Sequence, residues 1–143
     1  MNNGISYKEY LEKHGSLTYS NVGISMLPLL RQGRDLFIVC KKGKERCKAG
    51  DLVLYHRTPE QYVLHRIVEV RHNDYVVLGD NCIAREYGIT DDDIIGIMTG
   101  FVRDGREHSV KENGYRIYTF IWLHTASLRI ILKKCTKLVR SRI

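Results

Sequence analysis

Short apolar runs separated by turn residues fill the middle of this chain, and they constrain its fold more than any other feature. Five runs rich in Val, Ile, Leu and Tyr lie at residues 36–40, 52–55, 62–70, 75–78 and 94–102. Turn-forming residues stand between them, and Asp104-Gly105 predicts a hairpin turn after the last run. Many short strands with frequent turns predict a mainly β domain of coiled, barrel-like sheets.

Helical signals lie on both sides of this β region. Ser6 and Glu9 are spaced as a capping box, and Gly15 suits the end of the short helix that they start. Residues 17–22 then have an extended pattern. From Ile117 to Leu138 apolar residues recur at three- and four-residue spacing, with basic residues on another face. This predicts one basic amphipathic helix or two in sequence, and divides the chain into a β domain at residues 1–114 and a tail at residues 115–143.

The excess positive charge of the chain is concentrated in this tail. The formal net charge is +7, from 23 basic and 16 acidic residues. Seven basic residues follow Tyr115 and no Asp or Glu follows Glu112, so the body is neutral. Such asymmetry predicts an anionic partner for the tail, either membrane lipid or nucleic acid. No DNA-binding motif accompanies the tail, which disfavours nucleic acid.

The sequence gives no sign of a membrane span, a leader or a metal site. No run of 18 apolar residues occurs, and the polar N-terminus lacks a basic-then-apolar leader. The four cysteines form no C-x-x-C pair, and histidines do not cluster around them at ligand spacing. We therefore expect reduced thiols, no metal or other cofactor, and a cytoplasmic or peripherally membrane-associated protein.

The segment Gly23-Ile24-Ser25-Met26-Leu27-Pro28 is the first candidate for chemistry. A nucleophilic serine needs an exposed hydroxyl, a nearby base, and backbone N–H groups directed at the developing oxyanion. A glycine two residues before the serine allows close approach of a substrate. Taken alone, the segment is better explained as a loop serine packed beside a buried methionine.

His65 is the candidate base, and it lies in a run that follows a Gly50-Asp51 turn and an apolar strand. On a strand it shares a face with Val63 and Ile67. Desolvation there lowers the histidine pKa below about 6.5 and keeps the imidazole neutral, as a general base requires. Taken alone, a core histidine bonded to a backbone carbonyl is the simpler explanation.

Asp80, in Leu78-Gly79-Asp80-Asn81, is the candidate for orienting this base by accepting its second N–H. The alternative is a turn aspartate that bonds its own backbone.

Four segments follow one another over residues 22–102: the Ser25 segment, the Gly50-Asp51 turn with its apolar strand, the His65 segment and the Gly79-Asp80-Asn81 segment. In this order they resemble the type I signal peptidases, which share their catalytic fold with the LexA-like self-cleaving repressors. His65-Arg66-Ile67, with no lysine nearby, resembles the histidine branch of endoplasmic-reticulum, archaeal and sporulation-type enzymes.

The resemblance implies a LexA/signal-peptidase-like coiled β-barrel domain and a serine endopeptidase. Such an enzyme cleaves a signal or leader segment from a precursor polypeptide through an acyl-enzyme. Ser25 becomes the nucleophile and His65 the general base, while Asp80 or Glu86 becomes the orienting acid. The oxyanion contact would come from the N–H of Ser25 itself, in a substrate and oxyanion region that includes Gly23, Met26 and Pro28.

Two other functions remain open at this point, as does the place of the tail. A degenerate family member would bind peptides without cleaving them. A LexA-like self-cleaving regulator is disfavoured, because the segment before Ser25 is too short for a DNA-binding domain and no lysine stands at the base position. The tail either lies in an anionic membrane interface or packs on the β body, and Tyr118 with Trp122 favours the interface.

Overall fold

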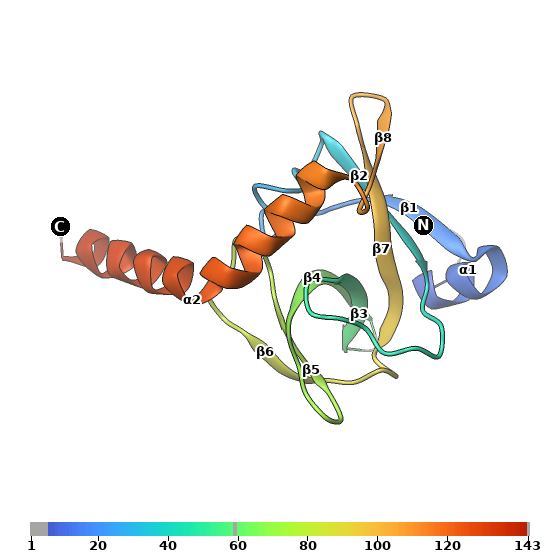
Figure 1. Cartoon of the computed structure of the whole chain (residues 1–143), viewed down its shortest axis with the longest axis horizontal. Helices are drawn as coiled ribbons and strands as arrows, with labels where there is room; N and C mark the ends of the chain where they lie inside the picture. The colour runs from blue at the N-terminus through green and yellow to red at the C-terminus, as the bar shows by residue number, and fades with distance from the viewer. Residues whose placement is uncertain (1–5, 59, 143) are drawn as a thin grey trace.

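One antiparallel sheet forms the centre of the molecule, with a short helix at the start of the chain and a long one at its end (Figure 1). The structure is a computed structural model that describes residues 6–58 and 60–142. The helices are α1 (Tyr7–His14) and α2 (Asn113–Ser141), and the strands are β1 (Ser16–Ser20), β2 (Asp35–Lys41), β3 (Leu52–Thr58), β4 (Gln61–Val70), β5 (Tyr75–Leu78), β6 (Glu86–Ile89), β7 (Ile94–Arg103) and β8 (Arg106–Ser109). The predicted mainly β fold with two terminal helices is confirmed.

The strands follow the order β1-β2-β7-β3-β4-β5-β6, and β8 pairs with β7. Among the described strands, β1, β6 and β8 therefore each pair with a single neighbour. Asp104 and Gly105 both have positive φ, at 53° and 75°, in the turn between β7 and β8. This is the backbone that two-residue hairpins need, which confirms the predicted turn. The short strands β6 and β8 were not predicted as strands, because both are polar and lack an apolar run.

Strand β4 is buried on both faces, and this places two polar side chains inside the protein. Leu64 belongs to one apolar cluster with Leu54 and Met26, whereas Ile67 belongs to a second cluster with Tyr55. The residues between them, His65 and Arg66, are 5% and 1% exposed. Because buried polar groups are costly unless they are bonded, the partners of these two side chains define the surroundings of the site.

The two helices are fixed by different means. In α1 the Ser6 hydroxyl accepts a hydrogen bond from the Glu9 N–H at 3.1 Å, Glu9 returns one, and Gly15 closes the helix at φ 80°. The predicted capping box and C-cap are therefore confirmed. Helix α2 is one helix of 29 residues. Its Ala126 and Ile130 pack on Leu78, and its later turns extend away from the sheet (Figure 1). No helix within residues 6–58 and 60–142 combines the length and apolarity needed to cross a membrane.

Candidate active site

Ser25 lies in the loop that connects β1 to β2, and this loop is held from both sides. Gly23 has a φ of 84°, a left-handed conformation that glycine adopts without strain, and its N–H donates to the Gln32 side chain at 2.7 Å. The fully buried Met26 anchors the loop in the core. The carbonyl of Ser25 accepts the N–H of Asn81 at 2.9 Å. Within the described residues, the hydroxyl and N–H of Ser25 form no hydrogen bond and are available to a substrate.

His65 is kept neutral by its burial. The pKa of its imidazole is lowered to about 4, mainly by desolvation, and the nearby positive charge of Arg57 acts in the same direction. The carboxylates of Glu86 and Asp80 act in the opposite direction and do not restore the ordinary value. At neutral pH the ring is therefore unprotonated, as we expected from its place on an apolar strand, and one ring nitrogen has a free lone pair.

The hydrogen bonds around the ring determine which nitrogen is free. The Tyr55 hydroxyl donates to Glu86 Oε2 at 2.7 Å, and the hydroxyl oxygen of Tyr55 lies 3.3 Å from His65 Nδ1. A phenol has only one proton to donate, so Tyr55 accepts at its oxygen and Nδ1 must carry the ring proton. The lone pair is consequently on Nε2. Tyr55 fixes the tautomer in which Nε2 is the base.

Glu86, at the start of β6, completes this chain of contacts. Its Oε1 lies 3.8 Å from His65 Nδ1, and Arg57 forms an ion pair with it. Burial alone would raise the pKa of Glu86, but hydrogen bonds from Arg57 and Tyr55 bring it below its ordinary value. Burial and the Glu86 carboxylate raise the pKa of Tyr55, so the phenol keeps its proton. Of the two predicted acids, Glu86 is the one that lies beside the base.

Tyr55 and Arg57 were missed by the sequence reasoning. Their signal is the strand pairing: β3 runs antiparallel to β4, with Val53 opposite His65 and Tyr55 opposite Val63. Tyr55 is therefore a diagonal neighbour of the histidine on the adjacent strand, a distance that an aromatic side chain spans. The alignment of two apolar runs in the sequence could have indicated this tyrosine.

Gly79 lets Ser25 and His65 approach each other. A Cβ atom at this position would lie 2.8 Å from the Ser25 carbonyl oxygen and 3.0 Å from His65 Nε2. It would also lie 2.6 Å from the sulfur of Cys82. Both the serine loop and the imidazole therefore border the space where a side chain would stand. The Gly-Asp-Asn segment contributes its glycine and Asn81 to the site.

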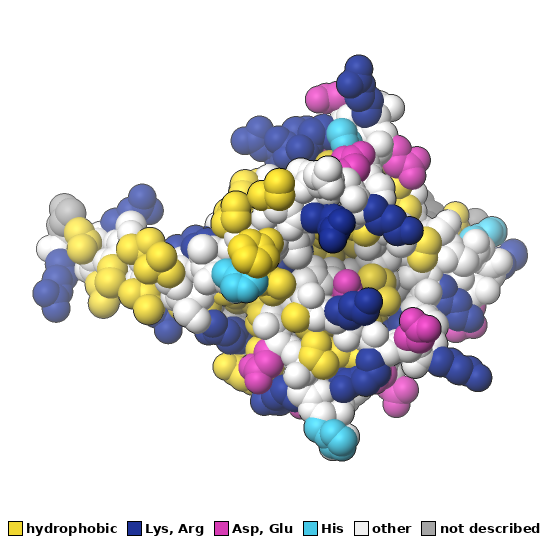
Figure 2. Space-filling view, in the orientation of Figure 1, with side chains coloured by type: hydrophobic (Ala, Val, Ile, Leu, Met, Phe, Trp, Pro, Cys, Tyr) yellow, Lys and Arg dark blue, Asp and Glu magenta, His cyan; other side chains and the backbone are white. Residues whose placement is uncertain are grey.

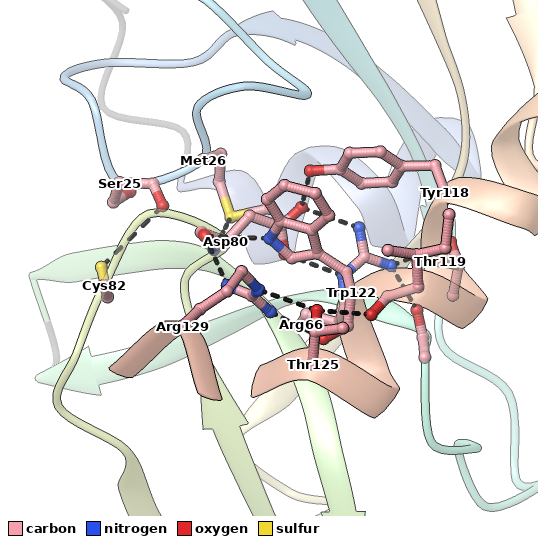
Figure 3. Close-up of polar contacts among 12 residues, drawn as sticks. Ser25, Met26, Arg66, Asp80, Cys82, Tyr118, Thr119, Trp122, Thr125 and Arg129 are labelled. Carbon is pink, nitrogen blue, oxygen red and sulfur yellow. Dashed lines mark hydrogen bonds and ion pairs between the residues drawn. The ribbon is translucent and has the colours of Figure 1, made fainter. Parts of the chain in front are cut away.

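Within the described residues Asp80 forms no hydrogen bond or ion pair with His65, contrary to the role we expected for it as the orienting acid. Its carboxylate accepts two hydrogen bonds from Arg66, at 2.8 and 2.9 Å, and one from the Tyr118 hydroxyl at 2.7 Å (Figure 3). Its carbonyl accepts bonds from Trp122 and Arg129, at 2.9 and 3.1 Å. The reason is the alternation along β4, which directs Arg66 to the opposite face from His65. Asp80 lies on the side of Arg66.

The same contacts decide how the first part of α2 is placed. Tyr118 and Trp122 stack on each other and donate to Asp80, so they face the β body. These two side chains therefore do not support a membrane interface for the first part of α2. Arg129 covers the Trp122 ring at 4.4 Å. The alternative that the tail packs on the body is correct for this part of the helix.

Two clefts meet at the imidazole. The first, which we call the serine cleft, has a volume of about 440 Å³ and is lined among others by Ser20, Val22, Ser25, Tyr62 and His65. The second, which we call the basic cleft, has a volume of about 930 Å³ and lies between the loops around Ile24 and Asn81 and the end of α2. His65, Arg57 and Cys82 line both.

Cys82 lies close enough to the site to be considered as a nucleophile. Its thiol is directed at the Ser25 carbonyl, with a sulfur–oxygen distance of 3.8 Å. Burial raises the pKa of this thiol, although Lys133 acts against that shift. A thiol with a raised pKa is a poor source of thiolate at neutral pH. Ser25 is therefore the better candidate.

The residues around these clefts include the groups that acyl transfer requires. They supply a hydroxyl, a neutral imidazole with a fixed tautomer, and a main-chain N–H for an oxyanion. The arrangement lies on an antiparallel sheet, with Ser25 on a loop and His65 on a buried strand. Comparison of the chain with protein-family models and with characterised proteins gives no match.

Proposed function

We propose that the chain is a serine endopeptidase of the signal-peptidase type, which cleaves a leader segment from a precursor polypeptide. One observation carries this proposal. The Nδ1–H of the buried, neutral His65 donates to the Tyr55 hydroxyl, which in turn donates to Glu86, and the imidazole lines the cleft that Ser25 also lines. The order of the motifs along the chain supports the same family, and with it a LexA-like fold for the β body.

The reaction follows from these positions. The Ser25 hydroxyl oxygen attacks the scissile carbonyl carbon while His65 Nε2 takes the hydroxyl proton. The Ser25 N–H donates to the oxyanion of the tetrahedral intermediate. His65 then gives its proton to the leaving amine, the C–N bond breaks, and an ester to Ser25 remains. Water attacks this ester with the imidazole again as base, which releases the acid and restores the serine hydroxyl.

Tyr55 and Glu86 act as positioning residues in this scheme. When Nε2 takes the proton, the ring becomes positive in a site where burial disfavours charge. The Glu86 carboxylate, 3.8 Å from Nδ1, compensates for part of that cost. Arg57 holds Glu86 ionised, so the negative charge is present before the reaction begins.

A serine-reactive phosphonate probe tests the proposal. We expect covalent labelling of the native protein at Ser25, and loss of labelling in Ser25→Ala and His65→Ala. Ser20→Ala is the matched control, because Ser20 lines the same cleft but is not the serine that His65 is proposed to activate. Native protein that labels no faster than Ser25→Ala would contradict the proposal and favour a peptide-binding module without catalysis.

We propose further that the outward face of α2 lies on an anionic membrane surface. Large apolar side chains there are between 47% and 61% exposed and recur at helical spacing: Ile117, Phe120, Ile121, Leu128, Ile131, Leu138 and Val139. Apolar and basic side chains lie together on the projecting part of the helix (Figure 2). An amphipathic helix with basic and no acidic residues is the type that binds anionic interfaces.

Vesicle flotation tests the membrane proposal. We expect the native protein to float with vesicles that contain phosphatidylglycerol and to remain unbound with phosphatidylcholine alone. Ile131→Gln with Leu138→Gln should abolish flotation. As a control, Val22→Gln with Tyr87→Gln changes two exposed apolar side chains of the β body. Equal flotation of the α2 double variant and the native protein would contradict the membrane proposal.

A further inference from the structure

The basic cleft opens directly on the proposed catalytic histidine. One wall is the later part of α2, which contributes Lys133, Lys137 and Arg140. The other wall is the segment after Asn81, with Ile83, Ala84 and Glu86, together with Ile24 from the serine loop. The lining thus combines apolar side chains with positive charges along the helix.

Among the described residues, three of the four basic side chains that line this cleft, Lys133, Lys137 and Arg140, form no ion pair with an acidic side chain, so most of its positive charge is not neutralised. Four basic side chains line it, whereas the only carboxylate in its lining is that of Glu86, which is bound by Arg57 and Tyr55. Lys133 donates to the backbone and side-chain oxygens of Asn81, which are neutral acceptors. Helix α2 contains no acidic residue that could pair with its own lysines. A concave surface lined by one sign of charge attracts the opposite sign.

We infer that the basic cleft binds an acidic, partly apolar segment of the polypeptide substrate, next to the bond that is cleaved. This inference rests on the proposed peptidase function, because it assigns the substrate class of that same site. The serine cleft and the basic cleft share His65. A chain that occupies both therefore passes the imidazole, with the acidic segment on one side of the scissile bond.

The helix geometry indicates how the acidic residues are spaced. Lys133, Lys137 and Arg140 are spread over about 10 Å along the helix axis, at roughly 1.5 Å per residue. An extended peptide covers that distance in about three residues. Two or more carboxylates within three or four positions would therefore each meet a basic side chain, while an apolar residue between them contacts Ile83 or Leu132.

A peptide fits this cleft better than a lipid surface does. The cleft lies between α2 and the catalytic loops, so its basic side chains face the protein body. The exposed apolar residues Leu128, Ile131 and Leu138 are absent from its lining and belong to the outward face of the helix. A flat bilayer can cover that outward face, but it cannot enter a concave space beside His65.

Binding of fluorescent peptides to Ser25→Ala measures the inference without cleavage. The probes are three ten-residue peptides with small residues at the centre. They differ only in one flank, which contains three Glu, three Gln or three Lys among apolar residues. We expect the Glu peptide to bind at least tenfold tighter than the Gln peptide, with a preference that weakens at high salt. The Lys peptide should bind weakest.

Charge reversal locates the effect. Lys137→Glu with Arg140→Glu, made in Ser25→Ala, should reverse the order of the Glu and Lys peptides. Lys134→Glu with Arg142→Glu is the matched control, with the same charge change on residues outside the cleft lining. Equal affinity for the Glu and Gln peptides, or an equal loss in the control, would overturn the inference. The inference would also be overturned if phosphatidylglycerol vesicles displaced all of the bound Glu peptide, because the basic side chains of the cleft would then bind lipid headgroups.

Phosphonate labelling of the native protein separates this inference from the proposed function. Labelling at Ser25 without a preference for acidic peptides would mean that the peptidase proposal stands and the substrate class is wrong. A preference for acidic peptides without labelling would mean that the cleft binds such segments in a protein that does not cleave them.

Discussion

Replacing Asp80 by Asn separates a structural acid from a catalytic one. Asp80 is one of two acids that the sequence offers to the base, but its carboxylate accepts three hydrogen bonds from Arg66 and Tyr118. The substitution keeps the size of the side chain and removes its charge. It also turns one acceptor atom into an NH₂ group that faces donors. The Arg66 guanidinium, 1% exposed, is then left charged and unpaired inside the protein.

The magnitude follows from that burial. Breaking a buried ion pair from one side costs about 3–5 kcal/mol, because a charge remains without a partner. For a chain of this size, that corresponds to a fall in Tm of roughly 10–20 °C. Glu86→Gln should behave differently, because an ion pair between partly exposed side chains such as Arg57 and Glu86 contributes only about 0–1 kcal/mol. It should instead slow phosphonate labelling about tenfold or more.

Urea unfolding followed by the fluorescence of the single tryptophan, Trp122, provides the assay. Its indole donates to the Asp80 carbonyl, so the probe lies at the perturbed site. Arg66→Met combined with Asp80→Leu is the control, since removing both charges should recover most of the lost stability. Asp80→Asn that unfolds within 1 kcal/mol of the native protein, while labelling falls a hundredfold, would refute this reasoning and make Asp80 the orienting acid.

Three further predictions concern the base and its surroundings. Tyr55→Phe should slow labelling of Ser25 at least tenfold and alter its pH profile, because the ring tautomer is no longer fixed; unchanged kinetics would contradict the role of Tyr55. Gly79→Ala should lower stability by about 1–3 kcal/mol and abolish labelling, because the new Cβ would displace the serine loop or the imidazole; the urea midpoint and a crystal structure check this. Because burial lowers the pKa of His65 to about 4, labelling should persist down to about pH 5. In the unfolded chain the His65 imidazole takes up a proton near pH 6.5, whereas in the folded chain it stays neutral until about pH 4. The free energy of unfolding should therefore fall by up to about 3 kcal/mol between pH 6.5 and pH 4, and His65→Gln should remove this dependence.

Much of the fold follows from local signals in the sequence. Apolar runs predict β2, β3, β4, β5 and β7, because these strands bury at least one face and the side chains on that face are apolar. The ends of α1 follow from Ser6, Glu9 and Gly15, whose roles depend only on the local backbone. Strands β6 and β8 are short and polar, so their composition does not predict them. They are extended because they pair with β5 and β7, respectively.

The site could be predicted only in part, and the reason is the face on which each side chain lies. His65 and Ser25 each follow from a short motif. The choice between Asp80 and Glu86 depends on which side of β4 each acid reaches, and sequence separation contains no such information. Tyr55 and Arg57 depend on the register between β3 and β4. The basic cleft depends on where α2 crosses the body, which the periodicity of the helix alone cannot fix.

The contacts of Asp80 have a consequence for where the folding unit ends. Tyr118, Trp122 and Arg129 all donate to this one residue, and Ala126 and Ile130 pack on Leu78 beside it. A chain shortened to residues 1–114 would expose the buried Arg66–Asp80 pair to water and leave the Asp80 carbonyl without its donors. Helix α2 therefore completes the folding unit of the β body by shielding its interior from water, and within the described residues its last hydrogen bonds to the body are those of Lys133 to Asn81.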